Sequence, residues 1–553
     1  MRLLMYSINY RVFGTIPRLK FLLLLAVSLF RLPFGEAATP IAEDTGPVAV
    51  LTASETAARI DQVFSETWAR SGVQPAEIAS DAVFVRRLYL DLAGRIPSVA
   101  EVRRFHDDPS TDRRTKLVDQ LLDSPAFVRH FTILWRNTLI PQARTTPELR
   151  ILLPGFEAWL WTRFSQQIPY DEMVRELVTS PVGVGEATGP VLRRASSPSA
   201  FYLARQLQPE NLATGMARAF LGVRLDCAQC HDHPFDSWKQ EQFWGMAAFF
   251  AGFQSPQNDD AAMMVRVERT GVRQILIPTT GRTVTAMFPG ETSPAAETRL
   301  APRAQLAEWM TAAENPWFAK MAANSVWSIF MGRGIVHPVD DFAEANPPAH
   351  PEILELLADQ FVAHDFDLQF LVRTITSAQV YQRSSLQTHD SQSDPAMFAR
   401  ATLRGLTPEQ LFDSLAEAVG FYQPYRTENP FVISTDSPRG RFLELFSDEA
   451  SSTQEKETTI LQALAMMNGD FVAEAVDPAR GKTLIAAIKF PLFEDMERIE
   501  MLYMASLSRI PDAEEAAELQ SLLQQAADRQ QKEQLLADIF WALLNSSEFL
   551  LNH

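Results

Sequence analysis

The residues of this chain best suited to chemistry are two cysteines and two histidines in Cys227-Ala228-Gln229-Cys230-His231-Asp232-His233. The 553 residues contain no other cysteine. Cys-x-x-Cys-His is the attachment pattern of haem c, because two thiols at this spacing can add to the two vinyl groups of one porphyrin. The histidine that follows then reaches the iron from the same side. The spacing therefore predicts one covalent haem c, held by Cys227 and Cys230, with His231 as the iron ligand.

Two other kinds of site fit the same segment. In an oxidising compartment Cys227 and Cys230 can form a disulfide, either structural or redox-active. The third interpretation is a metal site with the ligands Cys227, Cys230, His231 and His233. Its mixed sulfur and nitrogen donors favour zinc, or another divalent metal, over harder cations. The motif alone does not choose between haem, disulfide and metal.

An aromatic-rich segment follows the motif and suits either a porphyrin pocket or an ordinary helix core. Its aromatic residues are Phe235, Trp238, Phe243, Trp244, Phe249, Phe250 and Phe253. A sixth iron ligand is not assignable, and the candidates are Met246, Met263, Met264, His337 and His350. A filled sixth position is typical of electron transfer, whereas an open one admits small ligands or peroxide.

The N-terminus has the pattern of a secretory signal peptide. Residues 1–20 carry four basic residues and no acid, and residues 21–30 are apolar except for Ser28. We expect cleavage after Ala37, with an uncleaved anchor as the alternative, and a loose leader over 38–52. Loss of the five basic residues and one acid of 1–37 changes the formal net charge from −18 to −22. The mature chain is therefore expected in the periplasm or at the cell surface.

The rest of the chain is patterned mainly for helices. Helical periodicity begins near Ala53 and is expected over 84–92, 113–122, 302–383, 397–420, 456–468 and 495–551. Short strands are expected over 263–269, 273–278 and 282–288. This predicts a mainly α, multi-helical fold with domains at 53–258 and 301–553 and a small β insertion or linker at 259–300. No later stretch reaches about 18 uninterrupted apolar residues, so no transmembrane span is expected after the signal peptide.

A sequence repeat predicts a duplicated helical hairpin. Leu88-Tyr89, Arg95-Ile96-Pro97 and Glu101 recur 414 residues later as Leu502-Tyr503, Arg509-Ile510-Pro511 and Glu515. Each Arg-Ile-Pro is expected to form a corner between two helices, with its arginine capping carbonyls at the end of the first helix. Residues 121–127 resemble 543–549 in the same way, which extends the repeat.

The overall charge and the Gly-rich segment 332–334 each argue against one class of ligand. With 50 basic against 68 acidic residues, the chain has no surface suited to a polyanion, so no nucleic-acid partner is expected. Gly332-Arg333-Gly334 lacks the strand-before, helix-after setting of a nucleotide loop and is expected to be a helix C-cap and connector. Asp340 and Asp341, which follow it, form a carboxylate pair that could bind a cation.

Two long stretches resemble a pair of planctomycete domains. Residues 84–253 are similar to a cytochrome-like domain of unknown function, through Leu121-Leu-Asp-Ser124-Pro125 and the segments 88–97 and 222–235. Residues 303–548 resemble the surface-type domain that usually follows, through Asp340-Asp341-Phe342 and the segments 315–316, 332–334, 350–352 and 544–549. The resemblance implies a mostly helical, exported protein and supplies no settled activity. Many relatives begin with a separate small haem domain, which is absent before Phe84 here, so any haem is expected on residues 227–231 alone.

The leading functional prediction is an exported redox protein that carries one haem c and transfers electrons to extracytoplasmic redox or cell-surface proteins. One alternative is a non-haem structural or interaction protein of the cell surface, in which the motif forms a metal site or a disulfide. The other is a metal-dependent extracytoplasmic enzyme that acts on extracellular polymers.

Overall fold

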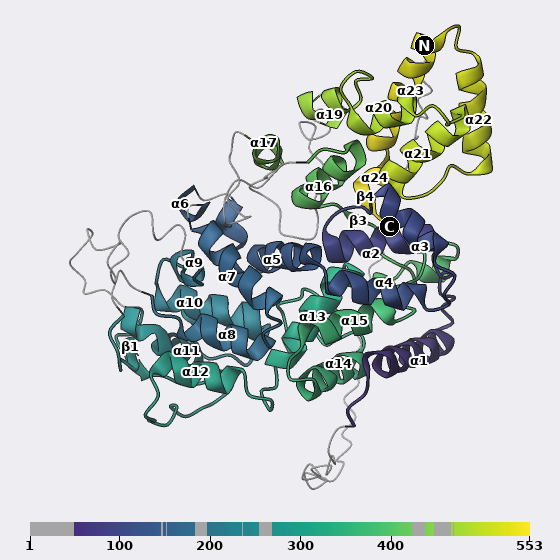
Figure 1. Cartoon of the computed structure of the whole chain (residues 1–553). Helices are drawn as coiled ribbons and strands as arrows, with labels where there is room; N and C mark the ends of the chain where they lie inside the picture. Colours follow the sequence, from purple (N-terminus) through teal and green to yellow (C-terminus); the bar gives the residue numbers. More distant parts are fainter. Residues whose placement is uncertain are drawn as a thin grey trace, which may run out of the picture. The chain divides into compact units, whose positions relative to one another are not determined.

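The computed structural model describes residues 49–144, 147–150, 152–182, 196–234, 236–253, 268–422, 437–446, 466–467 and 469–553. The fold is mainly helical, as the sequence predicts, with two small two-stranded sheets (Figure 1). The signal peptide, most of the leader, most of the predicted strand 263–269 and most of the predicted helix 456–468 lie outside the described residues.

Helices occupy the chain on both sides of the cysteine motif. Before it lie α1 (Ala53–Ser71), α2 (Asp81–Ala93), α3 (Val99–Asp107), α4 (Arg113–Leu122), α5 (Pro125–Leu139), η1 (Pro141–Arg144), α6 (Pro147–Arg150), α7 (Leu153–Ser165), α8 (Tyr170–Thr179), α9 (Ser199–Leu203), α10 (Pro209–Met216) and the π-helical turn η2 (Ala217–Leu221). The motif begins in the 3-10 turn η3 (Asp226–Gln229), which is followed by α11 (Gln240–Ala247) and η4 (Ala248–Phe253).

The second half of the chain is also helical. Its helices are α12 (Pro302–Met310), α13 (Phe318–Met331), α14 (Pro351–Ala363), α15 (Leu368–Ser377), η6 (Asp390–Gln392), η7 (Pro395–Met397), α16 (Pro408–Val419), α17 (Pro438–Leu445), α19 (Asp470–Ala475), α20 (Lys482–Lys489), α21 (Asp495–Leu507), α22 (Ala513–Gln524), α23 (Arg529–Leu544) and α24 (Ser547–Leu550). The predicted helix 397–420 is correct only from Pro408, because Thr407 caps a helix start there and Pro408 occupies the first turn.

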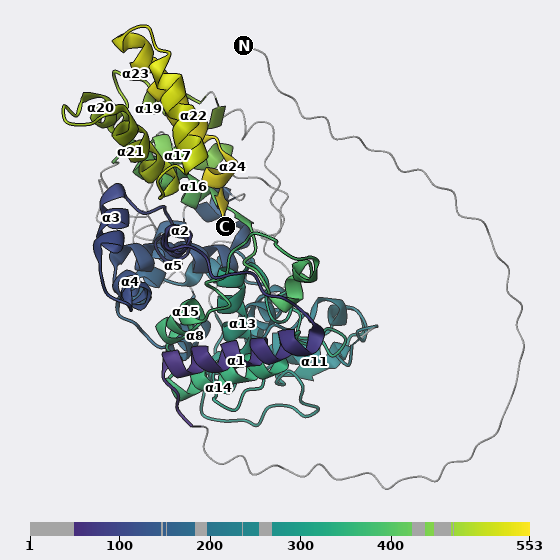
Figure 2. The same ribbon diagram turned by 90° about the vertical axis from the view of Figure 1, so that its right-hand side faces the viewer.

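Helix α1 begins at the predicted residue and is anchored to the second half of the chain. The hydroxyl of Thr52 accepts from the Glu55 N–H at 3.3 Å, which completes a capping box. Ile60, Phe64 and Trp68 are spaced four residues apart, so they form one buried stripe. This helix packs against α14 and α15 (Figure 2).

The end of the predicted leader is held in place. The side chain of Gln360 on α14 accepts from Leu51 N–H at 2.8 Å and donates to the carbonyl of Ala49 at 2.9 Å. Gln360 is almost fully buried, so both halves of its amide need partners. Residues 49–52 are therefore fixed, and the prediction of a loose leader is wrong for them.

The β insertion is confirmed in part. Strands β1 (Gln274–Leu276) and β2 (Thr283–Thr285) form an antiparallel hairpin with Ile275 opposite Val284. Residues 268 and 269 are not in a strand, so the described end of the predicted strand 263–269 is not β. A second ladder was not predicted: β3 (Arg404–Gly405) pairs with β4 (Leu551–Asn552). Two-residue strands leave no alternation to detect in a sequence.

Most buried apolar side chains fall into two clusters. The larger cluster takes side chains from Ala57 to Ala399, including both sides of residues 259–300. The smaller cluster takes side chains from Leu411 to Phe549 together with Leu90 and Ile96. Leu90 and Ile96 lie at the first Arg-Ile-Pro corner, so that corner packs into the core formed by the end of the chain.

The two corners have the same local structure, which confirms the repeat. Gly94 and Ser508 both adopt left-handed backbone conformations, with φ of +69° and +63°. Arg95 makes two hydrogen bonds of 2.9 Å to the carboxylate of Glu101. In the second copy Arg509 bonds the carboxylate of Glu515 at 2.6 and 2.8 Å. Each glutamate also completes the capping box of the helix that follows.

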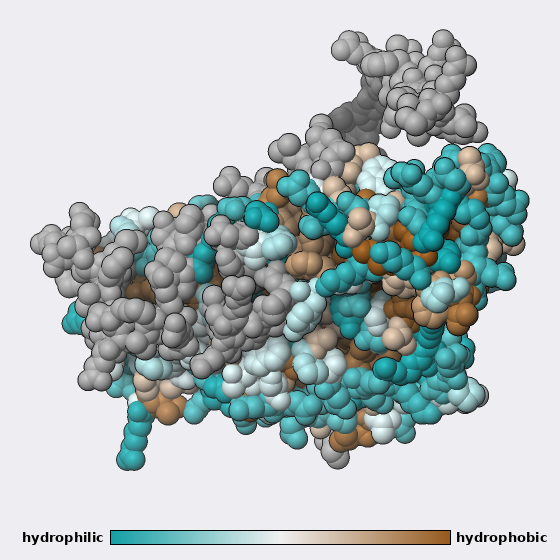
Figure 3. Space-filling model, turned by 45° about the horizontal axis from the view of Figure 1, so that its top comes forward, coloured by the Kyte–Doolittle hydropathy of each residue, from teal (hydrophilic) through white to brown (hydrophobic). Residues whose placement is uncertain are grey.

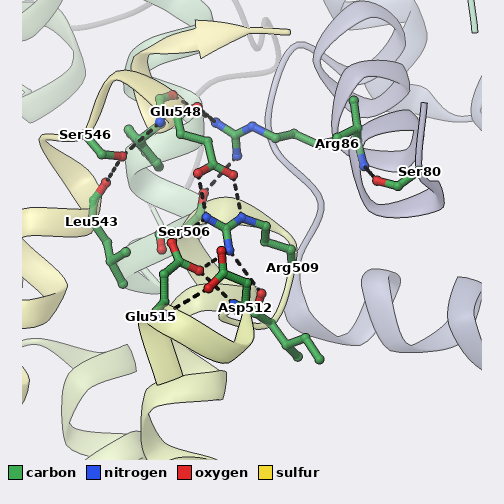
Figure 4. Close-up of polar contacts among 12 residues, drawn as sticks. Ser80, Arg86, Ser506, Arg509, Asp512, Glu515, Leu543, Ser546 and Glu548 are labelled. Atoms are coloured by element: carbon green, nitrogen blue, oxygen red, sulfur yellow. Dashed lines mark hydrogen bonds and ion pairs between the residues drawn. The ribbon is translucent and has the colours of Figure 1, made fainter. Parts of the chain in front are cut away.

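The sequence suggested that each corner arginine caps the end of the preceding helix. The structure shows instead that each one binds a carbonyl of the corner itself. Arg95 donates to the carbonyl of Ile96 at 2.8 Å, and Arg509 donates to that of Ile510 at 3.2 Å. Arg509 also binds Glu548, at 2.7 and 2.8 Å (Figure 4), whereas the second carboxylate near Arg95, that of Glu417, lies on α16. The second half of the repeat agrees too, because Ser124 and Ser546 both cap the helix that follows them.

The described surface is largely polar. The face drawn in Figure 3 shows mostly hydrophilic residues with smaller apolar areas between them, as on most globular proteins. Within the described ranges, no helix has both the length and the apolar character that a membrane crossing requires.

Candidate functional site

The cysteine motif forms an exposed turn over a buried base. The Ala228 N–H donates to the carbonyl of Leu225 at 2.9 Å, which closes the turn of η3. Leu225 and Ala228 are buried, whereas Cys227 and Cys230 are exposed. Both cysteines are free thiols. The apolar residues of the turn thus fix its base in the core and leave the two sulfur atoms accessible.

His231 is oriented by the main chain. Its Nδ1 lies 2.7 Å from the carbonyl oxygen of Asp232. A carbonyl can only accept, so Nδ1 carries the proton of the neutral ring, and Nε2 of that tautomer has the lone pair. Histidines that bind metals usually have this arrangement, because the bond at one nitrogen fixes the ring and the tautomer. His231 is exposed, so Nε2 is accessible.

Asp232 binds the start of helix α11, a role that its residue type alone did not predict. Its carboxylate accepts from the Gln240 N–H at 3.0 Å and lies 3.2 Å from Nζ of Lys239. These two contacts hold the pKa of Asp232 below its usual value, with the backbone bond as the larger cause. The carboxylate therefore accepts a hydrogen bond from an otherwise free N–H at the start of α11. Its negative charge also interacts favourably with the positive end of the helix dipole.

The proposed four-ligand metal set is not assembled. His233 is half-buried, and its main-chain N–H donates to the carbonyl of Trp238 at 2.8 Å. In the part of the chain that the structure describes, no three His, Cys, Asp or Glu side chains lie together as ligands of one metal would. A zinc ion would have to draw Cys227, Cys230 and the two histidines together.

The aromatic segment belongs to the core. The side chains of its described members are no more than 8% exposed and pack in the larger cluster; they are Trp238, Phe243, Trp244, Phe249, Phe250 and Phe253. Phe235 lies outside the described residues. Of the two interpretations of this segment, the helix core is therefore the correct one for these six residues.

Of the candidates for a sixth ligand, Met246 and His350 make other contacts, whereas Nδ1 of His337 is buried without a hydrogen-bond partner. Met246 is fully buried in the core. Nε2 of His350 bonds the carbonyl of Ala396 at 2.8 Å, and burial lowers the pKa of this histidine. Burial and Arg333 lower the pKa of His337. Met263 and Met264 are not described.

The Asp340–Asp341 pair is neutralised by arginines. Asp340 bonds Arg224 at 2.5 Å and lies 3.1 Å from Nε of Arg218. Asp341 lies 3.6 Å from the guanidinium of Arg224. The same Arg218 also lies 3.7 Å from Asp226, the first residue of η3. Arg218 therefore links the motif's turn to Asp340, and the described residues contain no cation site here.

Helix α11 holds the second half of the motif by its carbonyl groups. Nε2 of Gln240 lies 2.7 Å from the carbonyl of Cys230 and 3.2 Å from that of Gln229. The indole N–H of Trp244 donates to the carbonyl of Gln229 at 2.9 Å. Neither residue was singled out for this role from the sequence, because a glutamine on a helix carries no signal of its long-range partner.

These residues fit covalent haem attachment but supply no enclosing pocket. The two thiols are exposed on one turn, and His231 keeps Nε2 free. The aromatic side chains that would cover a porphyrin are packed inside the protein instead. A haem on Cys227 and Cys230 would therefore be attached at the surface.

Comparison with known families accounts for most of the chain. Residues 59–255 match PSCyt2, a protein of unknown function (DUF1549). Residues 302–441 and 433–523 match PSD1, a protein of unknown function (DUF1553). This chain belongs to the planctomycete-type two-domain family. The resemblance found in the sequence is thus confirmed, and the cytochrome-like PSCyt2 domain is the one that carries the motif. No curated protein and no solved structure matches the chain.

Proposed function

We propose that the PSCyt2–PSD1 protein is an exported redox protein that carries one haem c on Cys227 and Cys230, with His231 as its iron ligand, and that it transfers electrons. The observation that carries the proposal is the bond between Nδ1 of His231 and the Asp232 carbonyl. It fixes the ring of the residue that follows Cys230 and leaves its Nε2 accessible. When bound, the haem supplies one-electron chemistry.

Attachment needs nothing from the chain beyond the two thiols and access to them. Each thiol adds across one vinyl double bond, so that sulfur bonds to one carbon and the proton goes to the other. No oxidant is consumed in this addition. Because both thiols are exposed, a separate attachment system can reach them. Surface attachment also leaves the haem edge open to a protein partner, which suits electron transfer better than chemistry on an enclosed substrate.

Intact mass tests the proposal directly. The chain is expressed with a working haem-attachment system and exported, and its mass is measured after denaturation. We expect the mass of the chain plus one porphyrin, and a haem that stays with the chain on a denaturing gel. A chain without added porphyrin mass would end the haem proposal.

The two histidines then separate haem from zinc. With haem, His231→Ala should shift the reduced spectrum, because the iron loses its ligand, and His233→Ala should change it much less. In a zinc site both histidines are ligands, so the two substitutions should lower metal affinity to a similar extent. Metal analysis of the haem-free protein completes the comparison.

A dithiol–disulfide pair is the second candidate, and the buried aromatic segment favours it. A disulfide needs only the exposed thiols of one turn and no pocket. Oxidation of Cys227 and Cys230 would remove two protons and two electrons, which an extracytoplasmic disulfide-exchange protein accepts. The oxidised chain would be lighter by the mass of two hydrogens, and neither His231→Ala nor His233→Ala should affect the disulfide.

Export is part of the same proposal. The basic residues of 1–20, the apolar run 21–30 and the small residues around Ala37 support cleavage after Ala37. N-terminal sequencing of protein from its native host should begin at or near Ala38. An intact Met1 in the cytoplasmic fraction would contradict it.

A further inference from the structure

We infer that Gln240, together with Trp244, is a positioning residue for the Cys-x-x-Cys-His motif: α11 sets the place of Cys230 and His231 through the peptide carbonyls beside them. The inference rests on the proposed function for its purpose. The hydrogen bonds on which it rests do not require that the thiols carry haem or form a disulfide.

The first half of the motif is fixed by its own turn, whereas the second half is not. Cys227 lies within η3, which the Ala228–Leu225 bond closes over two buried side chains. Cys230 follows that turn as its C-cap residue, and its side chain is exposed. Its position relative to Cys227 therefore depends on what holds the main chain at residues 229 and 230.

The main chain there is held from α11. Gln240 and Trp244 are four residues apart, so their side chains lie on the same face of the helix. The amide of Gln240 donates toward the carbonyls of Gln229 and Cys230, and the indole of Trp244 donates to the Gln229 carbonyl. Trp244 is buried, so its donor has a fixed position.

Gln240 is itself fixed on two further sides. Its N–H donates to Asp232, which follows His231 in the motif, and its Nε2 lies 3.1 Å from the hydroxyl of Thr279. Thr279 lies between β1 and β2, so the hairpin supports the same side chain. Figure 1 shows β1 close to α11. One residue thus connects the motif, the helix and the β insertion.

Hydrogen exchange of the metal-free, reduced full-length chain tests the inference. Gln240→Glu keeps the shape of the side chain and replaces its N–H donors with an oxygen. Exchange in peptides that cover residues 226–234 should become about two- to tenfold faster, the effect of losing one or two ordinary hydrogen bonds. Trp244→Phe, which removes only the indole donor, should act in the same direction. Gln240→Lys restores a donor and should return exchange toward the wild-type rate.

Gln242→Ala is the matched control. Gln242 lies on the same helix and accepts from the Lys239 N–H, but it does not bond the motif. If Gln240→Glu exchanges like the wild type over 226–234, or if Gln242→Ala loosens this segment as much, the inference is wrong. Gln240→Ala repeats the test if the glutamate variant misfolds.

A second readout links the geometry to haem. With a haem-attachment system present, Gln240→Glu should lower the fraction of chains that carry porphyrin mass, and Gln240→Lys should restore it, while Gln242→Ala leaves it unchanged. Equal attachment in all four chains would show that the position of Cys230 does not matter to the site. If the wild type itself carries no porphyrin, the haem proposal fails, and the exchange experiment still decides the positioning role.

Discussion

The N–H of Phe342 donates to the carbonyl of Gly222 at 2.8 Å, and the ring of Phe342 lies where a side chain on Gly222 would be. Gly222 begins the segment that leads to Cys227, in the PSCyt2 domain. Phe342 ends Asp340-Asp341-Phe342, which lies within the PSD1 domain. The two segments by which the domains are recognised are therefore in direct contact.

This contact predicts a large effect of a small substitution. Gly222 has φ of +68°, and a Cβ there would lie 2.8 Å from Cε2 of Phe342. Gly222→Ala should lower the free energy of unfolding by the cost of a left-handed alanine, about 1–2 kcal/mol, plus an overpacking cost of about 1–3 kcal/mol. Urea denaturation measures the sum.

Gly72→Ala is the control for that experiment. Gly72 has φ of +66°, but no atom lies within 4 Å of the position of its Cβ. Only the backbone cost should remain there, about 1–2 kcal/mol. Equal losses for the two variants would show that the ring of Phe342 moves away freely.

The two corners predict similar losses of stability without any loss of function. Arg95→Ala removes the bonds to Glu101 and the Ile96 carbonyl, and Arg509→Ala removes those to Glu515 and Glu548. Each corner arginine is about 25% exposed, so we expect a modest cost of about 1–2 kcal/mol for either substitution. Thermal unfolding measures it, and any redox spectrum should be unchanged.

An exposed ion pair provides the comparison for the corners. Arg529 is 80% exposed and pairs with Glu533 four residues along α23. Arg529→Ala should cost less than about 0.5 kcal/mol, as is usual for such pairs. If Arg95→Ala and Arg509→Ala are as stable as Arg529→Ala, the repeated Arg–Glu geometry adds nothing to stability.

His130 predicts a dependence of stability on pH. Burial lowers the pKa of His130 to about 4, against the attraction of Asp413 and Glu409. Below about pH 6.5 the unfolded chain binds a proton that the folded chain does not, so stability is full above pH 6.5 and falls toward pH 4. The loss should reach about 3 kcal/mol at pH 4.

Equilibrium unfolding between pH 4 and 7.5 measures this slope. His130→Gln removes the titrating group and should flatten the slope, although His350, whose pKa is also lowered by burial, contributes to the same window. An unchanged slope in His130→Gln would assign the effect to other groups.

Substitution of Asp91 should cause the largest loss of folding stability among these polar substitutions. It is buried and accepts from Arg404 at 2.9 and 3.0 Å, from the hydroxyl of Tyr381 at 2.9 Å and from the amide of Asn552 at 2.8 Å. Asp91→Ala leaves the charge of Arg404 without its partner and should cost about 3–5 kcal/mol. Asn552→Ala removes one hydrogen bond and should cost about 1–2 kcal/mol. Chemical denaturation that ranks the two equally would contradict this account.

Local signals in the sequence predicted local structure well. The start of α1 follows from the helical periodicity that begins near Ala53, and the second corner follows from its similarity to the first, because periodicity and tight turns are set by residues a few positions apart. The hairpin of β1 and β2 was also found, although the predicted strands 273–278 and 282–288 extend beyond the observed ones at both ends. By contrast, β3 and β4 are 146 residues apart and two residues long, so no periodic pattern marks them.

The site was predicted by type but not by surroundings. Cys227, Cys230 and His231 are accessible side chains on one turn, as their spacing suggests. Asp340 seemed available for a cation because its arginine partners, Arg218 and Arg224, lie over 110 residues earlier. The role of Gln240 escaped notice for the same reason as β3 and β4: a long-range hydrogen bond leaves no mark on the residues around it.

The hydrogen-bond partners of Arg86 lie near the other end of the chain, so its burial depends on both ends. Its guanidinium donates to the carbonyls of Ser506, Glu548 and Phe549, more than 400 positions later (Figure 4). Without these carbonyls the guanidinium must stay hydrated, because burying an arginine without acceptors is unfavourable. A chain that ends before residue 506 therefore lacks all three acceptors and cannot complete the burial of Arg86. The first and last parts of the chain therefore complete their buried polar contacts together, although more than 400 residues separate them in the sequence.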